Sequence, residues 1–502
     1  MERASKSDDL FCRDLPTVAN PGMGKILVTG ATGYIGGRLL PELLARGYNV
    51  RVMTRLMSPD LLQRWPGVEI VEADALRPES LDVALEGVHT AYYLIHSLLL
   101  GKKKFEAADI DAAINFRRAA ERHGIRRVIY LGGLGDLQAH LSPHLTSRIQ
   151  VAQELKAGGY ATTIIRAAII IGSGSASFEI LKNLVKRFPI IFIPRWGKTR
   201  CQPIGIRDVV KYLVGVLEEV KSSGKSYDIG CDNVFTYEQM LRTFADVLGK
   251  KRLFIRMPLS MIGFYSYFVS LFTPVPPQIT RCLMEGCNNE VICKDCSIKN
   301  LLPFRPLSYR EALVRALTRE EQDRVHTRWS DAYPPAYELA IKLHELNPPP
   351  RFISEYSIST TQSPRVLFEN ICSIGGDRGW FNSNVLWRMR GLMDRILMGV
   401  GTSRGRRSPS QLRVNDVIDF WRVERMEKDR LLLLRAEMKL PGLGWLKFRI
   451  QQGKEKNCLS IAAFFQPRGV WGIMYWYLFL PFHHFIFYDI INQVEKLSRD
   501  TS

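Results

Sequence analysis

The stretch "KILVTGATGYIGGRLLPELLARGYNVRVMTR", residues 25–55, decides the fold of the first part of the chain. It opens with an apolar run typical of a strand, passes through a glycine-rich turn into an amphipathic helix, and ends in a second apolar run. A glycine pattern gains meaning only in such a strand-turn-helix context. The order of these segments therefore predicts a nucleotide-binding βαβ unit.

The glycines of this turn have separate physical roles. Gly30 permits a tight turn, Gly33 lets the backbone approach a pyrophosphate, and Gly36 lets the helix pack close to the sheet. The helix N-terminus that follows is a ready site for an anion. We expect a dinucleotide to contact Gly30, Thr32, Gly33, Tyr34, Ile35 and Gly36.

Charged residues after the second strand favour NADP over NAD, although NAD stays open. NAD would require a carboxylate at the strand end, and Glu42 lies too early in the sequence to reach a ribose. Arg55, helped by Arg38, suits a 2′-phosphate. At the end of the third strand we expect Asp74 and Ala75 to meet the adenine. For Arg55, a solvated charge at a strand end is the alternative.

The same rhythm continues along the chain. Further strands are predicted within residues 68–75, 89–98, 125–135 and 161–174, and helices such as 105–123 separate them. This alternation requires a parallel, doubly wound α/β sheet.

Length and charge bound the remaining possibilities. A chain of 502 residues is too long for one core. The formal net charge of +19 suits anionic cofactors or acidic membrane surfaces, and no basic block resembles a nucleic-acid motif. We therefore expect no nucleic-acid partner. Residues 1–23 contain no apolar segment, so they predict a flexible extension and neither a signal peptide nor an anchor.

The nine cysteines are scattered, which suits a reducing compartment and favours a cytoplasmic protein. Four of them crowd together at Cys282, Cys287, Cys293 and Cys296. Cys-x-x-Cys occurs only once there and no histidine lies nearby, so we expect free thiols and no metal site.

Several motifs resemble the short-chain dehydrogenase/reductase superfamily. They are the Gly-x-x-Gly-x-x-Gly turn, Asp74 and the "HLTSR" helix, and "AYYLIHSL", "YLGGLG", "GSGSASFE" and "QPIGIRDVVKYL" are similar to its atypical, extended branch. The resemblance implies a Rossmann domain with a small substrate lobe over residues 24–320. The lobe is expected to include the strand, turn and helix of 224–250.

The segment "SPHLTSR", residues 142–148, departs from the catalytic pattern of that superfamily. The resemblance places His144 at the usual Tyr and Arg148 at the usual Lys, while Gly132 and Gly133 replace the usual Ser. Arg148 can still bind ribose hydroxyls, but it keeps its proton permanently. His144 can act as acid or base near neutrality. Alternatively it only begins a helix, because "SPH" is typical of a cap followed by a proline.

Other candidates complete the predicted site. Tyr93 and His96, at the end of the fourth strand, are substitute acids, or they simply pack against the cofactor. By the resemblance, Phe178, Trp196 and Gln202 would line the substrate pocket, and core packing is the alternative for the two aromatics.

A second domain is predicted for residues 361–502, after a charged and proline-rich linker at 321–360. Short strands within 416–469 followed by a long helix at 471–498 suggest an antiparallel sheet gripping that helix. Motifs such as "GGDRGW" and "DFWRVE" resemble an uncharacterised bacterial domain, for which we expect the helix-grip fold of START-like proteins. Residues 388–407 carry six arginines against one Asp, which could meet acidic ligands or lipid head groups, or form a solvated face.

Two apolar stretches raise the question of the membrane. Prolines and small residues break the first, at 254–278, which favours a buried or surface helix. The second, "GVWGIMYWYLFLPFHHFIFY" at 469–488, contains Pro481 and two histidines. We expect it to close a cavity; peripheral membrane contact through its aromatics is the next alternative.

Together these features predict an NADP(H)-dependent oxidoreductase that acts on a bulky hydrophobic carbonyl, enone or quinone. The alternative is a catalytically silent NADP(H)-binding sensor or scaffold, associated with membrane or quinone metabolism. A cytoplasmic location, at most peripheral to the membrane, fits both, and the oligomeric state is open.

Overall fold

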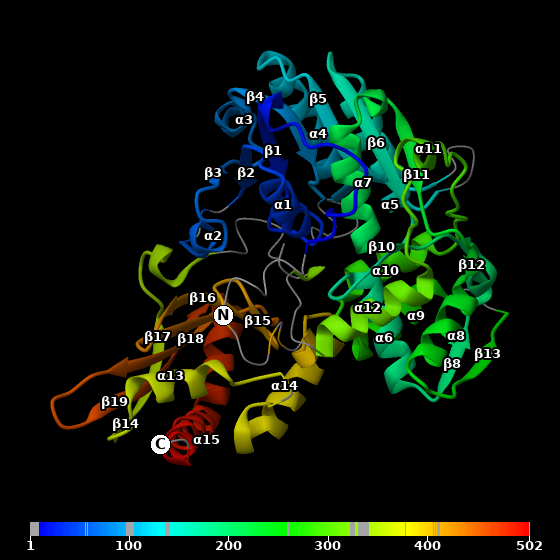
Figure 1. The fold of residues 1–502 in the computed structure, drawn as a ribbon. Helices are drawn as coiled ribbons and strands as arrows, with labels where there is room; N and C mark the ends of the chain where they lie inside the picture. The colour runs from blue at the N-terminus through cyan, green and yellow to red at the C-terminus, as the bar shows by residue number, and fades with distance from the viewer. Residues whose placement is uncertain are drawn as a thin grey trace. The chain divides into compact units, whose positions relative to one another are not determined.

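The computed structural model describes residues 10–55, 57, 59–96, 105–135, 141–258, 261–321, 327–329, 341–376, 378–404, 406, 408 and 412–500 (Figure 1). The chain forms two compact units. The first comprises Met1–Val269 and Gln278–Pro335, and the second Ser270–Pro277 and Ala336–Ser502.

A seven-stranded parallel sheet forms the centre of the first unit, in the order β11-β6-β5-β4-β1-β2-β3. The strands are β1 (Lys25–Thr29), β2 (Val50–Thr54), β3 (Glu69–Glu72), β4 (Val88–Tyr93), β5 (Arg127–Gly133), β6 (Ala161–Ala167) and β11 (Ser226–Ile229). The predicted doubly wound α/β sheet is confirmed. Because the order reverses between β1 and β4, a crevice is expected at the carboxyl ends of these strands.

Helices cover both faces of this sheet. The helices are α1 (Gly36–Ala45), α2 (Pro59–Arg64), α3 (Pro78–Leu85), α4 (Phe105–Arg122), α5 (Pro143–Lys156) and α7 (Ile206–Glu218). Apolar side chains of α1 and α7 share one core cluster, whereas those of α3, α4 and α5 share another. Each face of the sheet therefore has its own buried core.

A smaller lobe follows the sixth strand. Its helices are α6 (Ala176–Arg187), α8 (Tyr237–Val247), α9 (Ile262–Phe272), α10 (Pro277–Gly286), α11 (Ile298–Leu301) and α12 (Tyr309–Glu321), and its short strands are β7 (Ile170–Ile171), β8 (Ile190–Ile193), β9 (Arg200–Cys201), β10 (Ile204–Gly205), β12 (Phe235–Thr236) and β13 (Leu253–Arg256). One expectation about the lobe is wrong. The strand within 224–250, expected in the lobe, is β11, and it pairs with β6 as the edge strand of the main sheet.

The expected flexible extension is also wrong for the described residues 10–23. Phe11 and Cys12 are buried, and both of their backbone N–H groups donate to the carboxylate of Glu42 on α1. Lys211 on α7 forms an ion pair with Asp14 at 2.6 Å. Apolar side chains within a polar segment are enough to anchor it, because they complete the core next to α1 and α7.

The second unit contains a six-stranded antiparallel sheet in the order β14-β19-β18-β17-β16-β15. Its strands are β14 (Phe352–Thr360), β15 (Val417–Ile418), β16 (Trp421–Glu427), β17 (Leu431–Ala436), β18 (Gly442–Gln451) and β19 (Asn457–Pro467), and its helices are α13 (Pro364–Cys372), α14 (Asn384–Ile396) and α15 (Gly469–Asp500). The antiparallel sheet and the long final helix are confirmed. The START-like likeness stays a prediction.

Part of the predicted linker belongs to this sheet. Residues 352–360, within the expected linker 321–360, form β14, which pairs with β19 along its whole length. Exposed and partly buried residues alternate along β14, as they do in a strand with one covered face. The prolines at 348–350 concealed this strand, because they end immediately before it.

The helix α15 includes the long apolar stretch. Trp476, Phe487 and Ile490 point into the core between the helix and the sheet, and the Trp476 ring stacks on Phe465 with centroids 5.9 Å apart. None of the helices in the described part of the chain is long and apolar enough to cross a membrane.

A buried cluster of charges links the loops of the second unit to its sheet. The carboxylate of Glu437 accepts hydrogen bonds from Arg422 at 2.5 Å and from Arg404 at 2.6 Å. All three side chains are at most 3% exposed. Burial raises the pKa of Glu437, but the two guanidinium groups outweigh burial and lower this pKa to about 2.

We expect Glu437→Gln to lower the free energy of unfolding of the second unit by about 3 kcal/mol or more, because the substitution leaves buried guanidinium groups uncompensated. The folded-state pKa lies below its ordinary value of 4.5, so the stability from this carboxylate is complete above pH 4.5. It is lost as the pH falls toward 2. Hydrogen exchange of β16 and β17 in urea measures the change.

The matched control is Glu455→Gln, the same substitution at an exposed position of the β18–β19 connection. It should change the free energy of unfolding by no more than about 0.5 kcal/mol. Equal exchange rates in the two variants would contradict the assigned role of Glu437.

Candidate functional site

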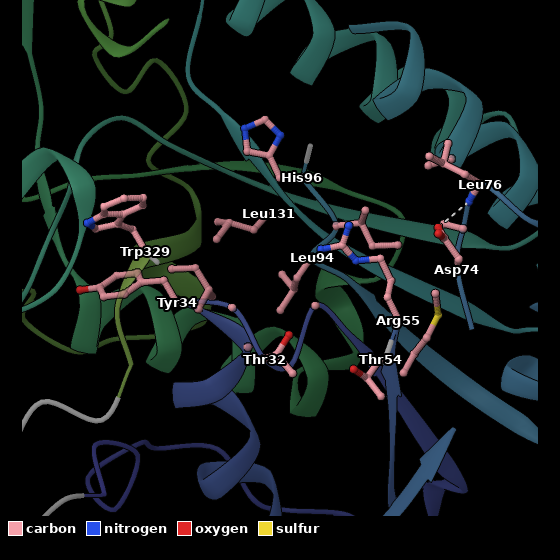
Figure 2. Close-up of a pocket in the computed structure, with 18 of the residues that line it drawn as sticks. Thr32, Tyr34, Thr54, Arg55, Asp74, Leu76, Leu94, His96, Leu131 and Trp329 are labelled. Carbon is pink, nitrogen blue, oxygen red and sulfur yellow. Dashed lines mark hydrogen bonds between the residues drawn. The ribbon is translucent and has the colours of Figure 1, made fainter. Parts of the chain in front are cut away.

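A cavity of about 320 Å³ lies at the carboxyl ends of the parallel strands, where the strand order reverses (Figure 2). Every sequence-predicted cofactor-binding residue lines it: Gly30, Thr32, Gly33, Tyr34, Ile35, Gly36, Arg55, Asp74, Ala75 and Arg148. These residues come from four separate segments of the chain. The sheet topology brings them together at one place.

The glycine turn forms one wall of the cavity. Gly30 has a φ of 64°, and a Cβ atom there would lie 2.6 Å from the carbonyl oxygen of Leu94. A Cβ atom at Gly36 would collide with the carbonyl oxygen of Gly30. Among the described residues, no side chain caps the N-terminus of α1, and the N–H groups of Gly37 and Arg38 donate to the carbonyl oxygens of Gly33 and Ile35, both at 3.0 Å. The turn therefore has the form of a phosphate cradle.

Arg55 and Asp74 lie at one end of the cavity (Figure 2). Arg55 is exposed just after β2. The Asp74 carboxylate accepts a hydrogen bond from the Leu76 N–H at 3.0 Å, and the backbone N–H of Asp74 donates to the Ser80 hydroxyl at 2.9 Å. This turn is thus fixed by its own hydrogen bonds. Burial lowers the pKa of Arg55, and the nearby charge of Asp74 opposes this shift.

Arg38 does not assist Arg55 as expected. Its guanidinium is buried beneath the glycine turn and donates to the carbonyl oxygens of Ser173 at 2.8 Å and Thr327 at 3.1 Å. The Thr327 hydroxyl in turn donates to the carbonyl oxygen of Tyr34 at 3.0 Å. Arg38 therefore holds the turn in place from below and has no access to a 2′-phosphate.

Apolar side chains also line the cavity. They are those of Leu94, Leu131, Ile279 and Trp329, with Trp329 beside Tyr34 in Figure 2. The backbone N–H of Trp329 donates to the carbonyl oxygen of Gly174 at 2.8 Å, which fixes the position of its segment. Sequence reasoning missed Ile279 and Trp329, because they are far from every motif and no local pattern marks them.

His96 is the titratable imidazole that lines the cavity. Its Nδ1 lies 2.9 Å from the carboxylate of Asp109 on α4, and Asp109 is 3% exposed. Its buried Nε2 has no hydrogen-bond partner among the described residues. Burial and the positive charge of Arg148 lower the pKa of His96, and Asp109 opposes this shift. A carboxylate that fixes one ring nitrogen determines what the other can do.

His144 does not line the cavity. Ser142 caps α5 by accepting from the Leu145 N–H, and Pro143 follows, so His144 lies in the first turn as the helix-start alternative implies. The His144 ring packs on His96 with centroids 5.1 Å apart. Burial, His96 and Arg148 lower the pKa of His144 well below its usual range. A histidine so placed is neutral near pH 7.

Arg148 lines the cavity but is already engaged. Its guanidinium donates to the carbonyl oxygen of Leu131 and lies 5.3 Å from the centroid of the Tyr130 ring. The Tyr130 hydroxyl donates to the backbone carbonyl of Arg148 at 3.2 Å. These contacts fix a permanent positive charge in the wall next to His96.

Tyr93 is placed away from the cavity as a core residue. It is 1% exposed and packs edge-on against Phe116, with ring centroids 5.0 Å apart. Burial raises the pKa of Tyr93 well above its ordinary value. Tyr93 packs in the core beside α4 and α5 and does not line the cavity, so it is not placed to act as a substitute acid there.

The predicted substrate residues are also part of the core and do not line this cavity. Phe178 stacks on Phe244 with centroids 5.5 Å apart, and Trp196 packs edge-on against Tyr237 at 5.9 Å. The side-chain amide of Gln202 joins two loops, because it donates to one backbone carbonyl and accepts from one N–H. For the two aromatics, the core-packing alternative describes the structure.

The nine cysteines are free thiols in the structure. Burial raises the pKa values of Cys287 and Cys293 to about 12. Within the described part of the chain, no three His, Cys, Asp or Glu side chains are grouped so as to hold a metal ion.

Two family models match the chain. Residues 23–268 match the NmrA-like family, and residues 347–490 match a family described as "Protein of unknown function (DUF2867)". The two matches correspond to the parallel and the antiparallel sheet.

Several relatives resemble the first part of the chain. A ceramide reductase from Caulobacter vibrioides is 28% identical over 48% of this chain and 76% of its own length. Subunit 9 of the NADH dehydrogenase [ubiquinone] 1 alpha subcomplex from Arabidopsis thaliana is 26% identical, over 46% of this chain and 60% of its own length. A divinyl chlorophyllide a 8-vinyl-reductase from Zea mays is 24% identical, over 47% and 62%. The chain thus spans about 60% of the length of the last two proteins.

Similar solved structures include the triphenylmethane reductase of Citrobacter sp. in complex with NADP(H), at 20% identity and a TM-score of 0.48 over 58% of this chain and 99% of that one. A UDP-glucose 4-epimerase of Thermotoga maritima is 15% identical, with a TM-score of 0.46 over 59% and 99%. Motifs, sheet topology and family matches agree: residues 23–268 form an NmrA-like Rossmann domain of the short-chain dehydrogenase/reductase superfamily, and a DUF2867 domain follows at 347–490.

Proposed function

We propose that the first domain is an NADP(H)-dependent reductase of a bulky hydrophobic carbonyl, enone or quinone. One observation carries the proposal: a single cavity combines a phosphate cradle, an exposed cation, apolar side chains and one imidazole. The names of two relatives, a ceramide reductase and a vinyl reductase, support reduction of apolar molecules.

The residues present fit a dinucleotide. The glycine turn and the start of α1 would hold the pyrophosphate, because no Cβ atom fills the approach. Asp74 would meet the adenosine, and Arg55 would pair with the 2′-phosphate. When bound, the reduced nicotinamide supplies a hydride. Leu94 and Leu131 exclude water from the end of the cavity where a hydrophobic substrate would lie.

His96 replaces the missing tyrosine as the proton donor in this proposal. Asp109 holds Nδ1, so Nε2 is the atom that faces a substrate oxygen. In carbonyl reduction Nε2 of the imidazolium would give its proton to the substrate oxygen, and solvent would return a proton to His96. Arg148 remains a fixed charge, because it cannot supply the proton.

One observation favours the alternative, a catalytically silent NADP(H)-binding sensor or scaffold. The position of the usual tyrosine holds His144, a helix-start residue outside the cavity lining, and that of the usual lysine holds Arg148, tied to the Leu131 carbonyl. Tight NADPH binding without turnover of any quinone, enone or aldehyde would support this alternative and overturn the reductase proposal.

We expect Arg55→Ala to weaken NADPH binding by about 10- to 100-fold, because a charge-assisted pair with the 2′-phosphate is lost. NADH binding should change less than about twofold, since NADH lacks that phosphate. Titration calorimetry with both nucleotides measures the change. The control is Arg126→Ala, which removes an exposed arginine outside the cavity. Equal losses for NADPH and NADH would contradict the assignment of Arg55.

We expect reduction to slow as the pH rises, because the imidazolium of His96 donates the proton. Burial and Arg148 lower the pKa of His96 from its ordinary value of 6.5. We therefore expect kcat/KM for reduction to fall as the pH rises past this lowered pKa. His96→Gln should remove this pH dependence and lower kcat by about 10²- to 10⁴-fold, with the Kd of NADPH unchanged.

The control for this experiment is His123→Gln, because His123 does not line the cavity and its Nε2 lies 2.9 Å from the carboxylate of Asp82. It should keep the wild-type profile. Asp109→Asn should shift the profile without abolishing turnover, as expected of a positioning residue. An unchanged profile in His96→Gln would remove His96 from the mechanism.

A further inference from the structure

The outward face of α15 is apolar over its first five turns. Trp471, Met474, Leu478, Phe482, Phe485 and Tyr488 are all exposed, Trp471 by 75%. Their spacing places them along one side of the helix, opposite the side that packs on the sheet. The stretch 469–488 contains no Asp, Glu, Lys or Arg. A helix on the surface of a domain ordinarily carries polar residues there, so this exposed stripe indicates a binding surface.

The helix α14 repeats the pattern. Val385, Met389, Leu392 and Ile396 follow helical spacing and are all exposed. The inward face contains Asp394, which is fully buried and accepts hydrogen bonds from the N–H groups of Gly401 at 2.8 Å and Lys439 at 2.6 Å. These buried polar contacts fix the rotation of α14 about its axis, so its apolar side faces outward.

The start of the exposed face of α14 lies close to the end of the exposed face of α15. The carboxylate of Asp489 on α15 accepts hydrogen bonds from the side chains of Asn382 at 2.9 Å and Ser383 at 3.0 Å, immediately before α14. Val385 lies within one helical turn of this contact, and Tyr488 is the neighbour of Asp489. This contact therefore connects the start of the α14 face to the end of the α15 face within the second unit.

The charges around these faces indicate which kind of partner could bind them. Arg388 on α14 and Arg468 just before α15 are exposed, and neither has an ion-pair partner among the described residues. The whole chain carries a net charge of +19. A second copy would bring the same arginines against these, whereas anionic lipid head groups bring the opposite charge. Exposed Trp, Tyr and Phe beside arginines are typical of helices that lie in a membrane interface.

We propose that the second domain binds the surface of an anionic phospholipid bilayer through the outward faces of α14 and α15. The helices lie along the interface, the apolar side chains enter the head-group boundary, and Arg388 and Arg468 contact lipid phosphates. This binding does not depend on the proposed reductase activity.

The test is flotation of the full chain with vesicles of phosphatidylcholine, with and without 30% phosphatidylglycerol. We expect flotation with the anionic vesicles, and about tenfold weaker binding without phosphatidylglycerol. Trp471→Ser with Phe485→Ser should reduce binding about tenfold or more. Because both side chains are exposed, circular dichroism should show an unchanged fold. Arg388→Gln with Arg468→Gln should reduce binding to anionic vesicles only.

The matched control is Val18→Ser with Val220→Ser, which removes equally exposed apolar side chains from the first unit. This variant should float as the wild type does. Failure of the wild type to float with anionic vesicles would overturn the proposal. So would a wild-type dimer in light scattering that becomes monomeric in the Trp471→Ser, Phe485→Ser variant, because a second copy would then cover the face.

Discussion

The close contact between α1 and β1 is the constraint on which the first domain depends. The chain leaves β1 through Gly30 at a positive φ and starts α1 at Gly36, where a Cβ atom would strike the Gly30 carbonyl. This contact aims the N-terminus of α1 at the reversal point of the sheet. The glycines therefore determine both how the first helix packs and where an anion can bind.

Much of the fold follows from local sequence patterns. Most of the strands from β1 to β6 and from β16 to β19 contain apolar residues between clear turns, so their succession along the chain could be predicted. The four residues of β11 carry no sign of which sheet they join, because strand pairing depends on distant partners. The predicted cofactor-binding residues of the cavity could be identified for the same reason as the strands, since they belong to local motifs. Trp329 and the Asp109–His96 pair could not, because only the tertiary fold brings them to the cavity.

Two of the corrections at the site concern Arg38 and His144. A helical arginine is usually solvated, yet Arg38 is buried because backbone carbonyls from two distant segments satisfy it. In sequence, His144 occupies the position of the tyrosine of the superfamily. In the structure, Ser142 and Pro143 start the helix so that the His144 imidazole packs on His96. The titratable group at the cavity thus moves from α5 to the end of β4. Arg148 contributes a charge there in place of a group that exchanges protons.

The contact between Arg38 and Thr327 bears on how this chain could be divided for expression. The NmrA-like match ends at residue 268, but Thr327 and Trp329 return to the glycine turn and the cavity wall. A fragment that stops at the family boundary would leave Arg38 without one of its carbonyl acceptors and would remove Trp329 from the cavity wall. A fragment that keeps this cavity intact must therefore extend through Trp329, well beyond the residues that match the family.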